Sequence, residues 1–431
     1  MNRLIILLLL FLLNNCSLNE NSQIWKDKEK NIENKKNIEK IFSDKKKAIS
    51  EFNPELKLDL AEIQTKNIII DNKNNYGSQS YEGSITKIGN YNFSKLENIN
   101  QLNFKPVFLN DGMIFFDKKG SIIRYKDTQK IVWKKNFYKK NERKLNPQLN
   151  FLLHGEDLLV ADNIAKYYSV NINSGKINWS KNSTYPFNSE IKKNKNKIFV
   201  VDYKNTLRCY NIEDGSECWN LQTENSFTIS NSKFSLIIID DMVVFSNSMG
   251  DITSVDIETG SIIWQLPTQS SNIINETYNF KTSKLVSDGK SIFFSNNKNE
   301  FYSVDVKTGI TNWINDINSN LTPIIIGNLL FTVSNEGYLY VVEKNEGNII
   351  RINDLYMGYK IKKRKDINPV GFAIGNSKLF LTNTDGKMLI VDLSLGSITG
   401  IKKVSANLSS KPFIYNQNLF VIKNGSVVQY N

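Results

Sequence analysis

The sequence predicts an all-β fold, namely an eight-bladed β-propeller built from four-stranded antiparallel blades. Three observations predict it: a unit that recurs at the spacing of one blade, alternating strands with no helices between them, and an eighth unit that stops before its last strand. The chain has 431 residues, of which 40% are hydrophobic. It can therefore bury a large core, and repetition explains how one domain reaches this length.

The recurring unit ends in a glycine that is followed four residues later by a tryptophan. Neighbouring glycine positions lie 38 to 49 residues apart, which is the length of one blade. Glycine supplies the positive φ of a tight hairpin, and tryptophan gives the outer strand an apolar face for the next blade. The clear copies are Gly175 and Trp179, Gly215 and Trp219, Gly260 and Trp264, and Gly309 and Trp313. Degenerate copies are Gln129 and Trp133, Gly347 and Arg351, and Gly396 and Gly400.

The eighth unit predicts how the ring closes. Seven units lie within residues 104–404, and the eighth, which begins at residue 416, lacks its fourth strand. We expect residues 83–96 to supply that strand, because a blade shared by the two ends of the chain leaves no sheet edge open. The predicted propeller domain is residues 79–431.

The N-terminal residues predict a signal that targets the protein to a membrane. Residues 1–15 have the form of a signal peptide, with Arg3 before the apolar residues 4–13, which are too few to span a bilayer. Cys16 directly behind this stretch resembles the lipidated cysteine of bacterial lipoproteins. The resemblance implies a lipid anchor on Cys16 and, since Leu18 is not aspartate, sorting to the outer membrane. The alternative is an ordinary cysteine in a signal segment.

Residues 16–78 are predicted to be a polar tether between the lipid and the propeller. The segment is rich in Lys, Asn and Glu and cannot bury enough apolar surface to fold alone. Apolar residues between Ile38 and Phe52 recur at near-helical spacing, so a short amphipathic helix could form there. Such a helix could dock on the propeller, a membrane or a partner, whereas a solvated spacer is the simpler interpretation.

No residue pattern indicates a catalytic or metal site. His154 is the one histidine and cannot form a multi-histidine metal site, and the chain contains no adjacent cysteines and no nucleophile or phosphate-binding motif. Aspartates are frequent, but they stand at repeated turn positions where a structural role explains them. We therefore predict a protein that is not an enzyme and needs no cofactor or metal.

Two further features concern cysteines and charge. Cys209 and Cys218 flank one hairpin turn, and pairing of Asn211 with Ser216 would place them opposite each other, so they either form a disulfide or are two small blade residues. The net charge is +12, and basic runs occur at residues 134–144, 192–197 and 360–365. If all three runs connect neighbouring blades, one face is positive and could meet an acidic partner or anionic lipid.

The units around Gly175 and Gly260 resemble the PQQ-like propeller repeat, and together with the lipoprotein start the chain resembles the BamB family. This resemblance implies a scaffold that faces the periplasm and binds BamA-like barrel proteins and other assembly-machinery lipoproteins, with no nucleic-acid partner. In that family an apolar pair followed by an arginine, and two acidic residues further on, contact BamA, and no equivalent of the arginine is evident here. These positions correspond to Phe227 and Ile229, and to Asn279 and Lys281, where the acidic residues are replaced.

Two alternatives to the scaffold stay open. PQQ-dependent dehydrogenases resemble this repeat, although their adjacent cysteines are absent here. A ligand-binding propeller would have a polar central funnel that binds a small molecule.

Overall fold

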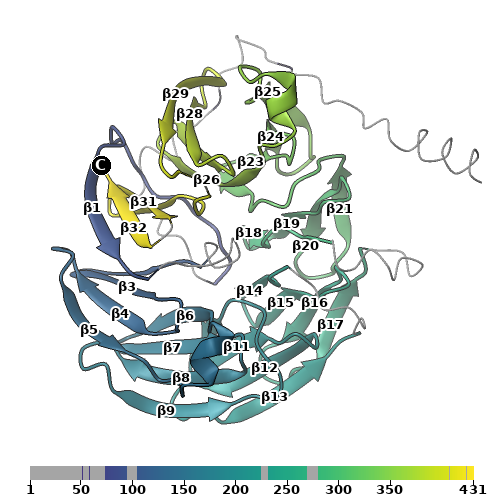
Figure 1. Cartoon of the computed structure of the whole chain (residues 1–431). Coiled ribbons are helices and arrows are strands. Elements are labelled where there is room, and N and C mark those ends of the chain that lie inside the picture. The colour runs from purple at the N-terminus through teal and green to yellow at the C-terminus, as the bar shows by residue number, and fades with distance from the viewer. Residues whose placement is uncertain are drawn as a thin grey trace, which may run out of the picture. The chain divides into compact units, whose positions relative to one another are not determined.

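Eight four-stranded antiparallel sheets form a closed ring, so the predicted eight-bladed propeller is confirmed (Figure 1). The computed structural model describes residues 51, 58, 73–94, 104–224, 232–268, 280–406, 408–423 and 425–431. The blades belong to one compact unit, Ser50–Asn431. The predicted signal peptide, Cys16 and most of the predicted tether helix lie outside the described residues.

The strands follow the chain from the inside of each blade to its outside. Blades 1 to 4 consist of β2 (Val107–Leu109), β3 (Gly112–Phe116), β4 (Ile122–Lys126) and β5 (Ile131–Lys135); β6 (Leu149–His154), β7 (Asp157–Asp162), β8 (Lys166–Asn171) and β9 (Ile177–Asn182); β10 (Lys192–Asn194), β11 (Lys197–Val201), β12 (Thr206–Asn211) and β13 (Glu217–Gln222); and β14 (Leu236–Ile239), β15 (Met242–Ser246), β16 (Ile252–Asp256) and β17 (Ile262–Leu266).

The second half of the ring repeats this order, with one exchange in the last blade. Blades 5 to 8 consist of β18 (Val286–Ser287), β19 (Ser291–Ser295), β20 (Phe301–Asp305) and β21 (Thr311–Asn315); β22 (Ile324–Ile326), β23 (Leu329–Val333), β24 (Tyr338–Glu343) and β25 (Ile349–Asp354); β26 (Pro369–Gly375), β27 (Lys378–Asn383), β28 (Lys387–Asp392) and β29 (Ser397–Lys403); and β30 (Phe413–Tyr415), β31 (Asn418–Lys423), β32 (Ser426–Tyr430) and β1 (Lys87–Asn92). Two single turns, 3-10 helix η2 (Glu142–Leu145) and α4 (Ile361–Arg364), lie between blades.

The N-terminal strand β1 closes the ring, as the incomplete eighth unit predicts. It pairs antiparallel with β32, and Tyr91 lies opposite Val427. The backbone pairing continues beyond the strand, since Thr86 and Asn431 exchange hydrogen bonds of 2.8 and 2.9 Å. The first and last strands of the domain therefore lie side by side in one blade (Figure 1).

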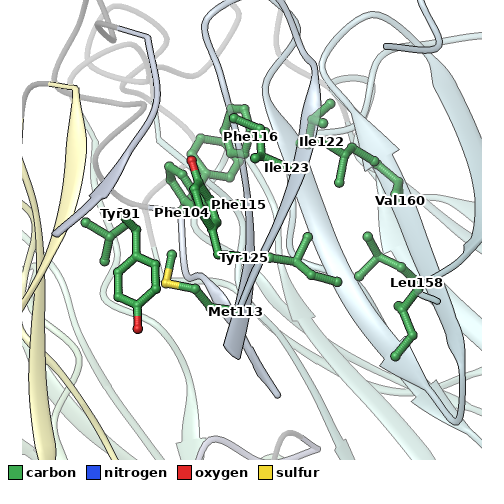
Figure 2. Close-up of a cluster of buried hydrophobic side chains, with 14 of the residues drawn as sticks. Tyr91, Phe104, Met113, Phe115, Phe116, Ile122, Ile123, Tyr125, Leu158 and Val160 are labelled. Atoms are coloured by element: carbon green, nitrogen blue, oxygen red, sulfur yellow. The ribbon is translucent and has the colours of Figure 1, made fainter. Parts of the chain in front are cut away.

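Burial explains the strand patterns. The middle strands are covered on both faces, so β15 is apolar along most of its length and four of its five residues are buried. The outer strand of the same blade, β17, is largely exposed, and Trp264 is its buried residue. The core consists of clusters between neighbouring blades, and Figure 2 shows one cluster, to which Phe115 and Phe116 of β3 and Val160 of β7 belong.

A tryptophan of one blade packs on the turn glycine of the next blade at five seams. The indole of Trp264 lies 2.6 Å from where a Cβ on Gly309 would stand, so no larger residue fits at that φ of 71°. Its Nε1 donates a hydrogen bond of 2.9 Å to the Val306 carbonyl. The equivalent contacts are Trp133 with Gly175, Trp179 with Gly215, Trp219 with Gly260, and Trp313 with Gly347. All five indoles donate to a backbone carbonyl of the next blade.

Arg351 takes the tryptophan position at the seam between blades 6 and 7. Its Nη1 donates to the Leu393 carbonyl at 2.7 Å, which is the same bond that the indoles make, and the side chain is 1% exposed. Asn353 lies against Gly396, the turn glycine of blade 7. The degenerate unit at Gly347 therefore keeps the hydrogen bond between the blades and changes the group that donates it.

A β-bulge recurs between the third and fourth strands of blades 1 to 7. In blade 4, Ser254 pairs with Trp264 and Val255 pairs with Ile262, so Ile263 is the additional residue. The bulge follows the tight turn with its left-handed glycine, and it turns the tryptophan toward the next blade while Ile263 stays 45% exposed.

The chain contacts the propeller before it reaches β1. The backbone carbonyls of Lys73 and Asn74 accept hydrogen bonds from Ile238 in β14 and Ser287 in β18 at 2.9 and 3.1 Å. Tyr81 is fully buried and packs edge-to-face on Phe380 of blade 7. These contacts extend the propeller domain N-terminal to residue 79.

Earlier residues of the predicted tether also reach the blades. Glu51 exchanges backbone hydrogen bonds of 2.9 and 3.0 Å with Ile352 of β25, and Leu58 packs against the apolar cluster of blades 6 and 7. No helix among the described residues is long and apolar enough to cross a bilayer.

Candidate functional site

The predicted partner contacts fall on two neighbouring connections between blades. Phe227, Ile229 and Asn279 lie outside the described residues. Lys281 is described and exposed, and its backbone N–H donates to Asn297 Oδ1 at 2.9 Å. The ends of the two connections meet, because Ser232 Oγ donates to the Phe280 carbonyl at 3.2 Å. The fold thus brings the β13–β14 and β17–β18 connections together at blades 4 and 5.

The basic runs do not all lie on one face, so that prediction is wrong for one of them. Residues 134–144 and 360–365 do lead from one blade to the next, and η2 and α4 form there. Residues 192–197 instead form β10, the turn after it and the start of β11. That turn is a hairpin within blade 3 and lies at the opposite face, because successive turns of an antiparallel sheet alternate between its two ends.

The frequent aspartates and asparagines hold turns. Between the second and third strands of a blade, Asp202 Oδ1 accepts hydrogen bonds from the backbone of Lys204 and Thr206. Between the third and fourth strands, Asp256 Oδ1 accepts from the backbone of Glu258 and Thr259. The same bonds recur in other blades, for example at Asp117, Asp162, Asn247, Asn296, Asp305 and Asp392. These carboxylates are occupied by backbone donors.

His154 ends β6, and its Nδ1 lies 3.0 Å from Lys193 Nζ of the next blade. Among the described residues, no group of three or more His, Cys, Asp or Glu side chains is placed to hold a metal ion.

The two cysteines are both free in the structure. Asn211 does bond to the Ser216 carbonyl, as the sequence interpretation assumes, but the bulge then shifts the pairing. Cys209 lies opposite Trp219 and is buried, while Cys218 is the additional residue of the bulge and is exposed. Direct opposition of the two cysteines is therefore wrong, and a disulfide between them stays a prediction.

Asp162 and Asp202 are the turn carboxylates with no exposed surface among the described residues, and burial shifts the pKa of Asp162. It is fully buried, and its Oδ2 accepts a hydrogen bond of 2.5 Å from the Tyr138 hydroxyl. The Tyr168 hydroxyl lies 3.3 Å from that of Tyr138. Burial raises the pKa of Asp162 to about 6, although the bonds from Tyr138 and from the backbone of Lys166 and Ile164 act in the opposite direction.

This raised pKa predicts a pH dependence of folding. In the unfolded chain the carboxyl loses its proton near its ordinary pKa, so between pH 4 and 6 the folded protein binds more protons and loses stability as pH rises. A shift of this size corresponds to about 3 kcal/mol. Relative to the parent, Asp162→Asn should gain about that much stability between pH 4 and 7, measured by urea unfolding. Asp256→Asn is the control. Bonds from Thr259 lower the pKa of Asp256, so its curve should slope the opposite way below about pH 4 and be nearly flat above about pH 5. A stability difference between Asp162→Asn and the parent that does not change with pH would contradict the raised pKa of Asp162.

A group of lysines gathers on the inside of the ring, and the sequence analysis missed it. Lys284 Nζ of blade 5 lies 3.0 Å from Glu190 Oε2 of blade 3, and Lys192 Nζ lies 3.7 Å from Glu190 Oε1. Lys105 of blade 1 and Lys411 of blade 8 interact electrostatically with both Lys284 and Glu190. We name these five residues the axial cluster. The signal is the residue after a serine that stands three positions before the innermost strand, as in Ser189-Glu190, Ser283-Lys284 and Ser410-Lys411.

Comparison with known proteins identifies the family. The family model described as "Outer membrane protein assembly factor BamB" matches residues 118–353, more than half of the chain. The outer membrane protein assembly factor BamB of Shewanella oneidensis is 22% identical over 271 residues, which cover 53% of this chain and 66% of that relative, just under two thirds of its length.

Solved structures agree on the fold and do not distinguish functions. BamB from Moraxella catarrhalis superposes with a TM-score of 0.63 at 16% identity, covering 80% of this chain and 99% of that one. A quinohemoprotein alcohol dehydrogenase from Comamonas testosteroni gives a TM-score of 0.62 at 9% identity, covering 82% of this chain and 78% of the dehydrogenase. The match of the family model to more than half of the chain, which folds into eight blades with tryptophan–glycine contacts at five seams, shows that this chain belongs to the outer membrane protein assembly factor BamB family.

Proposed function

We propose that this protein is a non-catalytic scaffold of outer-membrane β-barrel assembly. In this proposal a lipid on Cys16 anchors it to the outer membrane, the propeller faces the periplasm, and the joined β13–β14 and β17–β18 connections bind the periplasmic domains of a BamA-like barrel protein. Other lipoproteins of the assembly machinery are the further partners.

The family match over residues 118–353 carries the proposal, because it runs from blade 1 to blade 6 and includes both connections. The bond between Ser232 and Phe280 supports it, since one partner surface can contact both connections at once. The described turn carboxylates support a non-catalytic role, because backbone N–H groups already use them.

A binding measurement with purified components tests the partner surface. The mature chain, made soluble by Cys16→Ser, is titrated with the periplasmic domains of the BamA-like protein from the same genome. We expect Phe227→Ser/Ile229→Ser to weaken binding about tenfold or more, because apolar anchors dominate such interfaces. Lys281→Glu should also change the affinity. The control is Ile310→Ser, at the residue just before the outer strand β21 of blade 5, which is 67% exposed and lies away from both connections in sequence.

Two results would contradict the scaffold surface: no binding of the periplasmic domains by the parent chain, or equal losses in Ile310→Ser and in the double variant. The lipid anchor has a separate test. Expression with its own signal sequence and metabolic labelling with palmitate should label the parent chain and leave Cys16→Ser unlabelled and released from membranes. Labelling that survives in Cys16→Ser would reject Cys16 as the attachment site.

A PQQ-dependent dehydrogenase is the alternative, because the repeat of this chain resembles the repeat of those enzymes. Titration of the chain with PQQ and calcium, followed by dye reduction with alcohols, distinguishes the two. The scaffold proposal expects neither saturable quinone binding nor substrate-dependent reduction.

A further inference from the structure

The propeller repeat places equivalent side chains on the inside of three blades. Ser189, Ser283 and Ser410 each donate a hydrogen bond to the carbonyl of the following residue. Each also accepts one from the backbone of the second strand, at 2.8, 2.9 and 2.9 Å. Glu190, Lys284 and Lys411 follow these serines, and they therefore occupy equivalent positions in blades 3, 5 and 8.

The ion pair between Lys284 and Glu190 locates these side chains at the axis. Blades 3 and 5 are separated by blade 4, so side chains from their innermost ends meet across the inside of the ring. Lys233 makes a similar crossing, since its Nζ from the segment before β14 lies 5.4 Å from the centre of the Phe104 ring before β2. Blades 1, 3, 5 and 8 thus direct charged side chains to one place.

Positive charge greatly exceeds negative charge there. Glu190 is the one carboxylate of the axial cluster, against Lys105, Lys192, Lys284 and Lys411. Glu190 is also shared, because both Lys192 and Lys284 reach it. The Nζ of Lys233 is buried, and no described group accepts a hydrogen bond from it. One carboxylate cannot compensate this number of ammonium groups.

Burial and mutual repulsion disfavour the charged form of these lysines, and a bound anion would reduce both effects. Burial, and then the positive charges of Lys284 and Lys105, lower the pKa of Lys411 to about 7. Enclosure by the blades also lowers the pKa of Lys105, whose side chain keeps solvent-exposed surface, and burial lowers the pKa of Lys233 to about 8. Burial alone would raise the pKa of Glu190, yet Lys192 and Lys284 hold it down at about 2, so this group stays charged.

We propose that the axial cluster is a binding site for a small oxyanion that carries two negative charges, either a phosphate-type tetrahedral group or a dicarboxylate. Ammonium groups are compact donors that suit such anions, and those of Lys105, Lys284 and Lys411 come from three blades to one point. Lys284 follows Lys281 on the β17–β18 connection, so the site adjoins the proposed partner surface. Anion binding needs no partner protein, so the two proposals can fail separately.

Calorimetric titration of the full mature chain carrying Cys16→Ser tests the site. Sulfate is the tetrahedral probe and oxalate the dicarboxylate probe, because both keep two charges between pH 6 and 8. Sodium chloride at matched ionic strength is the background. We expect saturable binding of at least one probe, and its identity distinguishes the two ligand classes. Lys284→Gln/Lys411→Gln should weaken binding about tenfold or more, while Lys362→Gln/Lys365→Gln, two exposed lysines at α4, should leave it unchanged.

The pH dependence separates a binding role from a structural one. Lys411 must be protonated to attract the anion. Because its pKa is near 7, the affinity should rise about tenfold from pH 8 to pH 6. The accompanying proton uptake should make the measured heat depend on the ionisation enthalpy of the buffer. Lys105, Lys192, Lys284 and Glu190 are the other charged groups that face it. In Lys284→Arg/Lys411→Arg, binding should persist and much of the pH dependence should disappear. No saturable binding of either probe above the chloride background, or unchanged binding in the folded glutamine variant, would overturn the proposal.

Discussion

Replacing Trp264 with alanine should lower the free energy of unfolding by about 3–5 kcal/mol, the range for removing a large buried aromatic side chain. The indole is 9% exposed, fills the seam between blades 4 and 5 against Gly309, and bonds to the Val306 carbonyl. Its loss leaves a cavity and an unpaired carbonyl in the same place. Urea unfolding followed by circular dichroism measures the change without relying on tryptophan fluorescence.

Ile263→Ala is the matched control for that substitution. Ile263 is the neighbouring residue of the same strand, but the bulge leaves it 45% exposed. We expect a loss below about 1 kcal/mol. Equal losses for the two variants would mean that the seams contribute no more than the outer surface of the blades.

Deleting the N-terminal region through β1, so that the chain starts at residue 96, should abolish the stable monomer. Tyr81, Ile85 and Tyr91 are each less than 5% exposed, and their burial is worth roughly 5–9 kcal/mol in total. That is comparable to the whole stability of a typical domain. The deletion also leaves β32 as an open edge that can pair with other chains. Size-exclusion chromatography should show aggregates, and the cooperative thermal transition should disappear.

Two companion experiments make this result specific to closure. Removing only residues 17–49 should leave the melting temperature nearly unchanged, because that deletion keeps every described contact of the propeller. Adding a peptide of residues 73–95 to the shortened chain should restore the monomer by strand complementation. A shortened chain that stays monomeric and melts like the parent would show that the ring does not depend on β1.

The blades could be predicted from sequence because each depends on short-range chemistry that recurs. A glycine such as Gly260 gives the turn, Trp264 gives the seam, and the missing strand of the last unit requires residues near Tyr91. The N-terminal extension could not be predicted, since the chain around Lys73 is polar and its partners in β14 and β18 are more than 160 residues away.

The errors at the candidate sites have local causes. The bulge adds one residue that pattern counting does not register, and this displaced Cys218 from Cys209. Residues 192–197 form a hairpin within a blade and not a connecting loop, and Lys192 belongs to the axial cluster. Arg351 in place of tryptophan suggested a degenerate unit, yet its guanidinium supplies the same donor as an indole. The axial cluster joins blades that are far apart in sequence, so no single unit reveals it.

The order of contacts along the N-terminal segment determines how the domain would carry mechanical load. Any tension applied from the N-terminal side reaches the backbone bonds of Lys73 and Asn74 with blades 4 and 5 before it reaches β1. Those bonds, and Tyr81 packed on Phe380, would have to yield before force could peel the closing strand from β32. These contacts therefore protect the pairing of β1 with β32 against force applied to the N-terminal segment.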